Sequence, residues 1–248
     1  GRYAACVAAS GWCPAESRRD IDKDVPRTFG LGGMNLRELE PHLRRVLMAY
    51  AVADPETAYC QGMGFVAGAA LLPFVTESQP PSAADEERAF AWLGFMVNGP
   101  LAGCYSSGMA GLAAHQQALR ELLQRRRPAL VAHLDDLGCP IECFTAPLLL
   151  KGFQQLPLPL ALEAMDLLAA RRVSALQLVL AVCEHAAPAM TRAKDAIDVQ
   201  NALAQACDMR MRLRTLVDAH VGGRERCMRR RSVRCRRCPR YLPVRQSP

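Results

Sequence analysis

Residues 41–51, Pro-His-Leu-Arg-Arg-Val-Leu-Met-Ala-Tyr-Ala, carry the clearest secondary-structure signal in the chain. Their apolar side chains recur at the i, i+3, i+4, i+7 and i+8 spacing of an amphipathic helix. These side chains are Leu43, Val46, Leu47, Tyr50 and Ala51. Pro41 suits the first turn of such a helix, and the dipeptide Asp54-Pro55 breaks it. The stretch therefore predicts an α-helix.

The same periodicity recurs along most of the chain. It predicts further helices over about 63–72, 83–97, 112–123, 128–137, 141–155, 159–171, 174–186 and 195–219. Ser82 and Asp85, three residues apart, predict a capping box at the start of one of them. A clean period-2 alternation between turn signals, which would indicate strands, is missing from the sequence. We therefore expect an all-α array of many helices without a significant β-sheet.

The N-terminal region gives weaker signals. Residues 1–17 are too short and irregular to assign. Residues 18–36 predict an ordered loop, because Pro26 removes a backbone donor and three glycines follow it closely. We therefore expect three parts: an N-terminal fragment over 1–17, one helical domain over 18–222, and a tail over 223–248.

The positive charge of the chain is concentrated in its C-terminal tail. The sequence has a net charge of +7, and residues 224–248 contain ten arginines and one acid. The tail thus carries +9, which leaves −2 for residues 1–223. A domain that binds a nucleic-acid duplex is expected to be basic. We therefore do not expect the folded part to bind nucleic acid.

The tail itself has few large apolar residues, so we expect it to be disordered alone. Three interpretations stay open: binding to anionic lipid on a cytosolic membrane face, RNA binding without sequence preference, or an unselected extension from a truncated or mispredicted reading frame. We favour the third, because runs such as Arg229-Arg230-Arg231 with interspersed cysteines are unlike a linker. A zinc site at Cys227, Cys235 and Cys238 is disfavoured, because a structural site uses four ligands and only His220 is near.

The cysteine usage indicates a reducing compartment. The eleven cysteines are unevenly spaced, and most lie inside apolar runs, as buried free thiols do. An odd number also fits a disulfide framework poorly. No apolar stretch reaches the roughly 18 residues that span a bilayer. The chain starts without Met or a signal-peptide pattern, so we expect a cytoplasmic fragment of a longer protein.

Two short motifs contain candidate functional residues. The first is Ile21-x-x-Asp24-x-x-Arg27, and the second is Tyr59-x-Gln61. An arginine offers a planar, permanently charged fork for phosphate oxygens. A glutamine amide can donate and accept hydrogen bonds without titrating.

With these motifs about 30 residues apart and an amphipathic helix between them, the sequence resembles the TBC family of Rab GTPase-activating proteins. The resemblance covers roughly residues 18–220. The matching strings are Asp24-Val25-Pro26-Arg27-Thr28-Phe29, Leu47-Met48-Ala49-Tyr50-Ala51 and Tyr59-Cys60-Gln61-Gly62-Met63-Gly64-Phe65. The family's fold, an all-helical TBC-like array, agrees with the periodicity.

The resemblance implies a role for each residue of the two motifs. Arg27 would be an arginine finger, exposed on a loop and held by Asp24, and Gln61 would orient the attacking water in place of the GTPase's own glutamine. Tyr59 would shape the contact with the GTPase. Three further residues would support the site. Ile21 would pack in the interior, Thr28 belongs to one of the matching strings, and Gly62 would permit close approach of the backbone.

The resemblance also implies the partner and the cellular role. The chain would complete the active site of a Rab-type GTPase rather than turn over a substrate of its own, and it would act in vesicle trafficking. It would need no cofactor, because the GTPase carries GTP and Mg²⁺. We expect it in the cytoplasm or peripheral on endomembranes. The alternative is a TBC-like binding module that recognises a GTPase or a trafficking protein without catalysis.

Overall fold

The structure, a computed structural model, describes residues 1–28, 37–74, 80–206 and 213–220. Within these ranges the regular structure is entirely helical, which confirms the predicted all-α class. The α-helices are α1 (Arg2–Ala8), α2 (Ala15–Thr28), α3 (Glu40–Ala53), α4 (Met63–Leu71), α5 (Ala83–Asn98), α6 (Ala110–Arg126), α7 (Pro128–Asp136), α8 (Ile141–Leu150), α9 (Leu158–Ala169), α10 (Ala175–Met190), α11 (Ala196–Ala206) and α12 (Leu213–His220). Three short 3₁₀ helices are η1 (Ser10–Trp12), η2 (Arg37–Leu39) and η3 (Leu72–Phe74).

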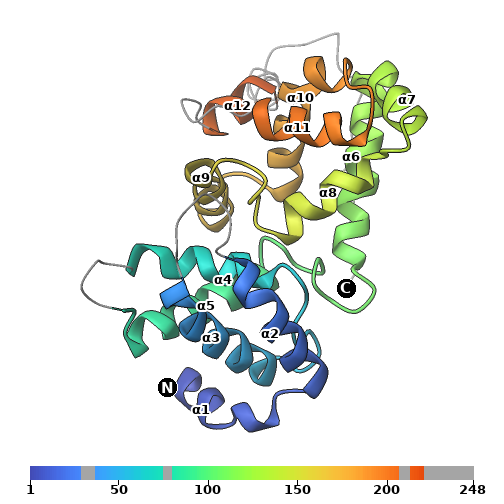
Figure 1. Cartoon of the computed structure of the whole chain (residues 1–248). Helices are drawn as coiled ribbons and strands as arrows, with labels where there is room; N and C mark the ends of the chain where they lie inside the picture. The colour runs from blue at the N-terminus through green and yellow to red at the C-terminus, as the bar shows by residue number, and fades with distance from the viewer. Residues whose placement is uncertain (29–36, 75–79, 207–212, 221–248) are drawn as a thin grey trace, which may run out of the picture.

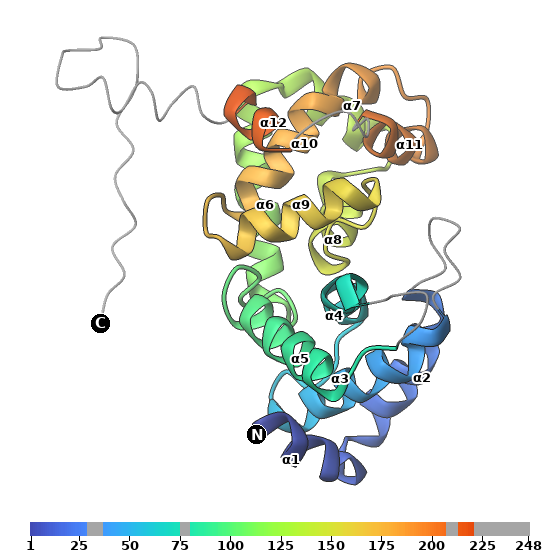
Figure 2. The same ribbon diagram turned by 90° about the vertical axis from the view of Figure 1, so that its left-hand side faces the viewer.

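The helices form two halves (Figures 1 and 2). In the first half, α1, α2, α4 and α5 pack around α3, and in the second half α6, α7, α8, α11 and α12 pack around α10. Helix α9 joins the second half through its contact with α12. Among the described helices, every pair that packs together extensively belongs to the same half. The segments between helices therefore contribute much of what joins the halves.

The central helix of each half is buried on most of its surface. In α3 every predicted core position is buried, and so is the whole run from Val46 to Ala51. In α10 the run from Leu178 to Cys183 is buried. Six consecutive apolar residues cover every side of a helix, so each of these runs needs neighbours on every side. The apolar runs of these two helices therefore favour a central position among other helices.

The predicted helix boundaries are confirmed where local signals set them. Ser82 and Asp85 form the predicted capping box at the start of α5. Helix α8 ends at Leu150 rather than near 155, because Gly152 and Phe153 both adopt positive φ angles, +56° and +62°. The single helix expected over 195–219 is described as α11 and α12, and residues 207–212 between them lie outside the described residues.

The N-terminal segment is helical and joined to the first half by a buried ion cluster. The Glu86 carboxylate on α5 is 5% exposed and accepts hydrogen bonds from the Tyr3 hydroxyl and the Arg45 guanidinium. His42 Nδ1 lies 2.6 Å from the same carboxylate. A buried carboxylate needs such donors, because its desolvation is costly otherwise. The cluster therefore connects α1, α3 and α5.

The prediction of a loop over residues 18–36 is wrong for residues 18–28, because α2 runs from Ala15 to Thr28. The helix buries Ser17, Ile21, Val25 and Thr28, a spacing that lines one helical face. Pro26 removes one backbone hydrogen bond, but this loss falls in the last turn, and packing against α3 outweighs it. The glycines at 30, 32 and 33 lie outside the described residues.

Candidate functional site

Arg27 lies in the last turn of α2, not on a loop as expected. The residue is exposed, whereas its neighbours Val25 and Thr28 are buried. The structure gives its guanidinium no hydrogen bond or ion pair in the part of the chain that it describes. The end of a packed helix therefore presents an exposed charged fork that has no partner among the described residues and that suits an anion.

Asp24 does not pair with Arg27, which corrects the expected contact. Its carboxylate instead accepts a hydrogen bond of 2.9 Å from the Tyr59 hydroxyl. Burial raises the pKa of Tyr59 well above its usual value, and the charge of Asp24 and this hydrogen bond raise it further. Tyr59 therefore stays a donor at physiological pH. The contact joins the first motif to the second across 35 positions of sequence.

Gln61 is exposed in the turn immediately before α4. The residue after it, Gly62, is the N-cap of α4 and has a φ angle of +105°. Met63 is fully buried, and its sulfur accepts a hydrogen bond of 3.4 Å from the backbone N–H of Cys60. The turn thus has a buried anchor on its C-terminal side, while the Gln61 side chain stays accessible.

The two motifs lie against each other, and we refer to residues 21–28 and 59–64 as the finger segments. The Thr28 hydroxyl donates to the Asp24 carbonyl at 3.0 Å, and a Cβ on Gly64 would lie 2.8 Å from this hydroxyl. Ile21 is fully buried, as expected for a packing residue. Arg27 and Gln61 therefore project from two segments that contact each other.

Sequence reasoning missed the residues that touch both finger segments from the second half. The Gln154 side chain donates to the Thr28 carbonyl at 3.2 Å. The Leu150 carbonyl lies against Gly62, and the Tyr105 hydroxyl donates to that carbonyl at 2.8 Å. Gly152 signals a turn in the sequence, but no local pattern predicts which distant segment that turn contacts.

We expect Gly62→Ala to lower the free energy of unfolding by about 2–4 kcal/mol. The positive φ angle disfavours any side chain, and a Cβ would lie 2.2 Å from the Leu150 carbonyl oxygen. Gly138→Ala is the matched control, because Gly138 also has a positive φ angle, but a Cβ there would meet no atom of the described chain within 4 Å. Urea denaturation measures both variants. Equal losses in the two would contradict the close approach of the Leu150 carbonyl.

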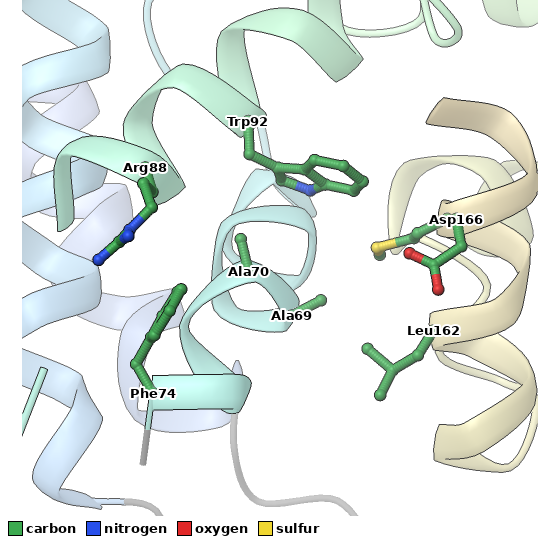
Figure 3. A pocket seen from close by; sticks show the side chains of 8 residues that line it. Ala69, Ala70, Phe74, Arg88, Trp92, Leu162 and Asp166 are labelled. Atoms are coloured by element: carbon green, nitrogen blue, oxygen red, sulfur yellow. The ribbon is translucent and has the colours of Figure 1, made fainter. Parts of the chain in front are cut away.

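A concave surface of about 240 Å³ lies between α4, α5 and α9 (Figure 3). Its walls are mostly apolar, with Trp92 and Asp166 facing it from α5 and α9. Arg88 at its edge is already engaged by Asp85, at 2.6 Å, and by the ring of Phe74. The side chains that line the pocket do not include a nucleophile beside a general base, or a general acid beside a general base, as a catalytic site would. The finger segments are therefore the better candidate site.

Other kinds of site find no support among the described residues. They contain no cluster of His, Cys, Asp and Glu side chains arranged to hold a metal ion. The cysteines considered for zinc, Cys227, Cys235 and Cys238, lie outside the described residues. None of the described helices combines the length and the apolarity that crossing a bilayer requires.

Comparison with known proteins points to one family. Residues 10–190 match the model of the Rab-GTPase-TBC domain family. The structure is similar to the crystal structure of the Ypt/Rab-GAP domain of Gyp1p, with a TM-score of 0.75 and 13% identity over 91% of this chain and 79% of that one. It is also similar to a Chlamydomonas flagellar RabGAP TBC domain, with a TM-score of 0.69 and 22% identity over 89% of this chain and 71% of that one.

Curated relatives show the same similarity in sequence. Growth hormone-regulated TBC protein 1 of Rattus norvegicus is 34% identical over 119 residues, which are 46% of this chain and 38% of the relative. Rab GTPase-activating protein eat-17 of Caenorhabditis elegans is 33% identical over 156 residues, 59% of this chain and 16% of the relative. The matched region thus spans well under half the length of these relatives.

Proposed function

Because the chain belongs to the Rab-GTPase-TBC domain family, we propose that it accelerates GTP hydrolysis by a small GTPase of the Rab family. The observation that carries the proposal is the pair of exposed side chains, Arg27 and Gln61, on finger segments joined by the Asp24–Tyr59 hydrogen bond. Hydrolysis of a γ-phosphoryl group needs positioning and charge stabilisation more than groups that make bonds. An arginine and an amide can supply both.

In this proposal Arg27 stabilises the charge that develops on the phosphoryl oxygens. Its guanidinium has no ionic partner among the described residues, so binding breaks no ion pair with any of them. The last turn of α2 fixes the backbone position from which this side chain would reach the GTPase. The GTPase would supply GTP and Mg²⁺, and the domain would need no cofactor of its own.

Gln61 would orient the attacking water. Its amide oxygen can accept a hydrogen bond from the water while its amide N–H₂ donates to a phosphoryl oxygen. The buried anchor at Met63 and the special backbone of Gly62 support the turn that carries it. Asp24 and Tyr59 would act through the backbone, because their hydrogen bond holds the two finger segments together.

The second candidate is a binding module that recognises a GTPase or a trafficking partner without catalysis. Single-turnover hydrolysis with a panel of GTP-loaded Rab-type GTPases distinguishes the two, with Arg27→Ala as the control domain. Acceleration by the unaltered domain, without acceleration by the Arg27→Ala domain, supports the proposal. Binding of a GTPase without any acceleration would support the binding module instead.

We propose that residues 18–222 form the activating domain and that the tail over 223–248 is separate from its chemistry. The protein would act in vesicle trafficking, in the cytoplasm or peripheral on endomembranes, where the basic tail could meet anionic lipid at about 1 kcal/mol per basic residue. RNA binding by the tail and an unselected extension stay as alternatives.

Removing residues 224–248 is expected to change the rate on a soluble GTPase by no more than about twofold, because both finger segments precede the tail. Single-turnover hydrolysis in solution measures the rate, and circular dichroism controls for folding. A large loss of activity in the folded, truncated protein would place the tail in the site.

A further inference from the structure

We propose that the end of α8 and the turn after it, residues 150–154, position both finger segments, with Gln154 as the positioning residue for Arg27. We refer to residues 150–154 as the bridging turn. The inference rests on the proposed function, and it adds a segment of the second half that sets the position of the finger segments. In both overall views the connection between α8 and α9 lies beside α4, where the two halves meet (Figures 1 and 2).

The first contact is made by Gln154. Its Nε2 donates to the carbonyl of Thr28, the residue directly after Arg27. The last carbonyls of a helix lack an N–H partner within the helix, so this side chain satisfies one of them at the end of α2. The Gln154 Oε1 is buried and has no partner among the described residues, so the bond to Thr28 is the one side-chain hydrogen bond of Gln154 within them.

The second contact reaches the other finger segment. The Leu150 carbonyl lies so close to Gly62 that a Cβ there would stand 2.2 Å from its oxygen. The hydroxyl of Tyr105 donates to the same carbonyl at 2.8 Å, and burial raises the pKa of Tyr105 well above its usual value. A hydroxyl that stays protonated keeps the carbonyl in place. The backbone next to Gln61 therefore rests on a fixed surface.

The bridging turn is itself closely packed. Phe153 is fully buried despite a φ angle of +62°, a conformation that persists only where the surroundings enforce it. Its N–H donates to the Leu148 carbonyl at 2.7 Å. A Cβ on Gly152 would lie 2.1 Å from the Met165 methyl and 3.5 Å from Val66. The turn is thus held between α9 and α4.

These contacts make one segment the common support of Arg27 and Gln61. Because the extensive helix contacts stay within each half, the bridging turn links the packing of the second half to the finger segments. A misplacement of about 1 Å at a reacting group can cost on the order of 10²-fold in rate. The position of Arg27 therefore depends on a glutamine that lies 126 positions after the end of α2, and the position of Gln61 depends on the Leu150 carbonyl of the same segment.

The test compares Gln154→Met with Gln155→Met in the full chain. Gln155 is the matched control, because it is the adjacent glutamine and its side chain makes no hydrogen bond within the described part of the chain. We expect Gln154→Met to lower the single-turnover rate at saturating domain about five- to tenfold, while the concentration that gives half the maximal rate stays unchanged. We expect Gln155→Met to leave the rate near that of the unaltered chain.

Amide hydrogen exchange gives a readout that does not depend on GTPase activation. Gln154→Met should speed exchange in the last turn of α2, and Gln155→Met should not. Equal rates and equal exchange in the two variants would overturn the positioning role. An unaltered chain that activates no GTPase would contradict the proposed function instead, and the exchange comparison would still decide whether Gln154 restrains the end of α2.

Discussion

Arg27→Ala is expected to reduce the single-turnover rate of GTP hydrolysis in the complex by about 10³–10⁵-fold, the range for an arginine supplied in trans. The thermal stability should not change, because Arg27 is exposed and makes no hydrogen bond or ion pair with the described residues. Arg27→Lys should lose nearly as much activity, since an ammonium keeps the charge but not the bidentate fork.

A neighbouring arginine on the same helix provides the control for this measurement. Arg19 is also exposed on α2 and makes no ion pair among the described residues, so Arg19→Ala should retain activity. Differential scanning fluorimetry checks that each variant is folded. Near-full activity of Arg27→Lys at equal stability would contradict the finger assignment.

The second large effect concerns Gln61 and the catalytic glutamine of the GTPase. If Gln61 orients the water, the domain should still accelerate a GTPase whose own glutamine is changed to alanine or leucine. Gln61→Ala should lower the rate on both forms of the GTPase by about 10²-fold or more, the scale for removing one preorganised group at a transition state. A domain that supplied only Arg27 would depend on the glutamine of its partner.

Single-turnover hydrolysis with four combinations of domain and GTPase measures this effect. Gln117→Ala is the control, because Gln117 is an exposed glutamine on α6 and lies outside the finger segments. Some residual dependence on the GTPase's glutamine is compatible with the proposal. Complete inactivity on the glutamine-less GTPase, with complex formation demonstrated by a binding assay, would leave Arg27 as the single finger.

The sequence by itself determined the features that depend on residues a few positions apart. The apolar spacing in residues 41–51 predicted α3, and the pair Ser82 and Asp85 predicted the cap of α5, because a helix and its cap are formed by neighbours within about four residues. The motif resemblance likewise located Arg27 and Gln61. Their exposure agrees with that assignment, and their catalytic roles stay predictions.

Only the tertiary structure decided which distant groups meet. Pro26 and the glycines after it favoured a loop, yet α2 extends to Thr28 because its apolar face packs on α3. Asp24 pairs with Tyr59 rather than with Arg27, and Gln154 reaches the end of α2 across 126 positions. Local spacing constrains the backbone of one element, whereas the partner of a polar group depends on how elements distant in sequence pack together.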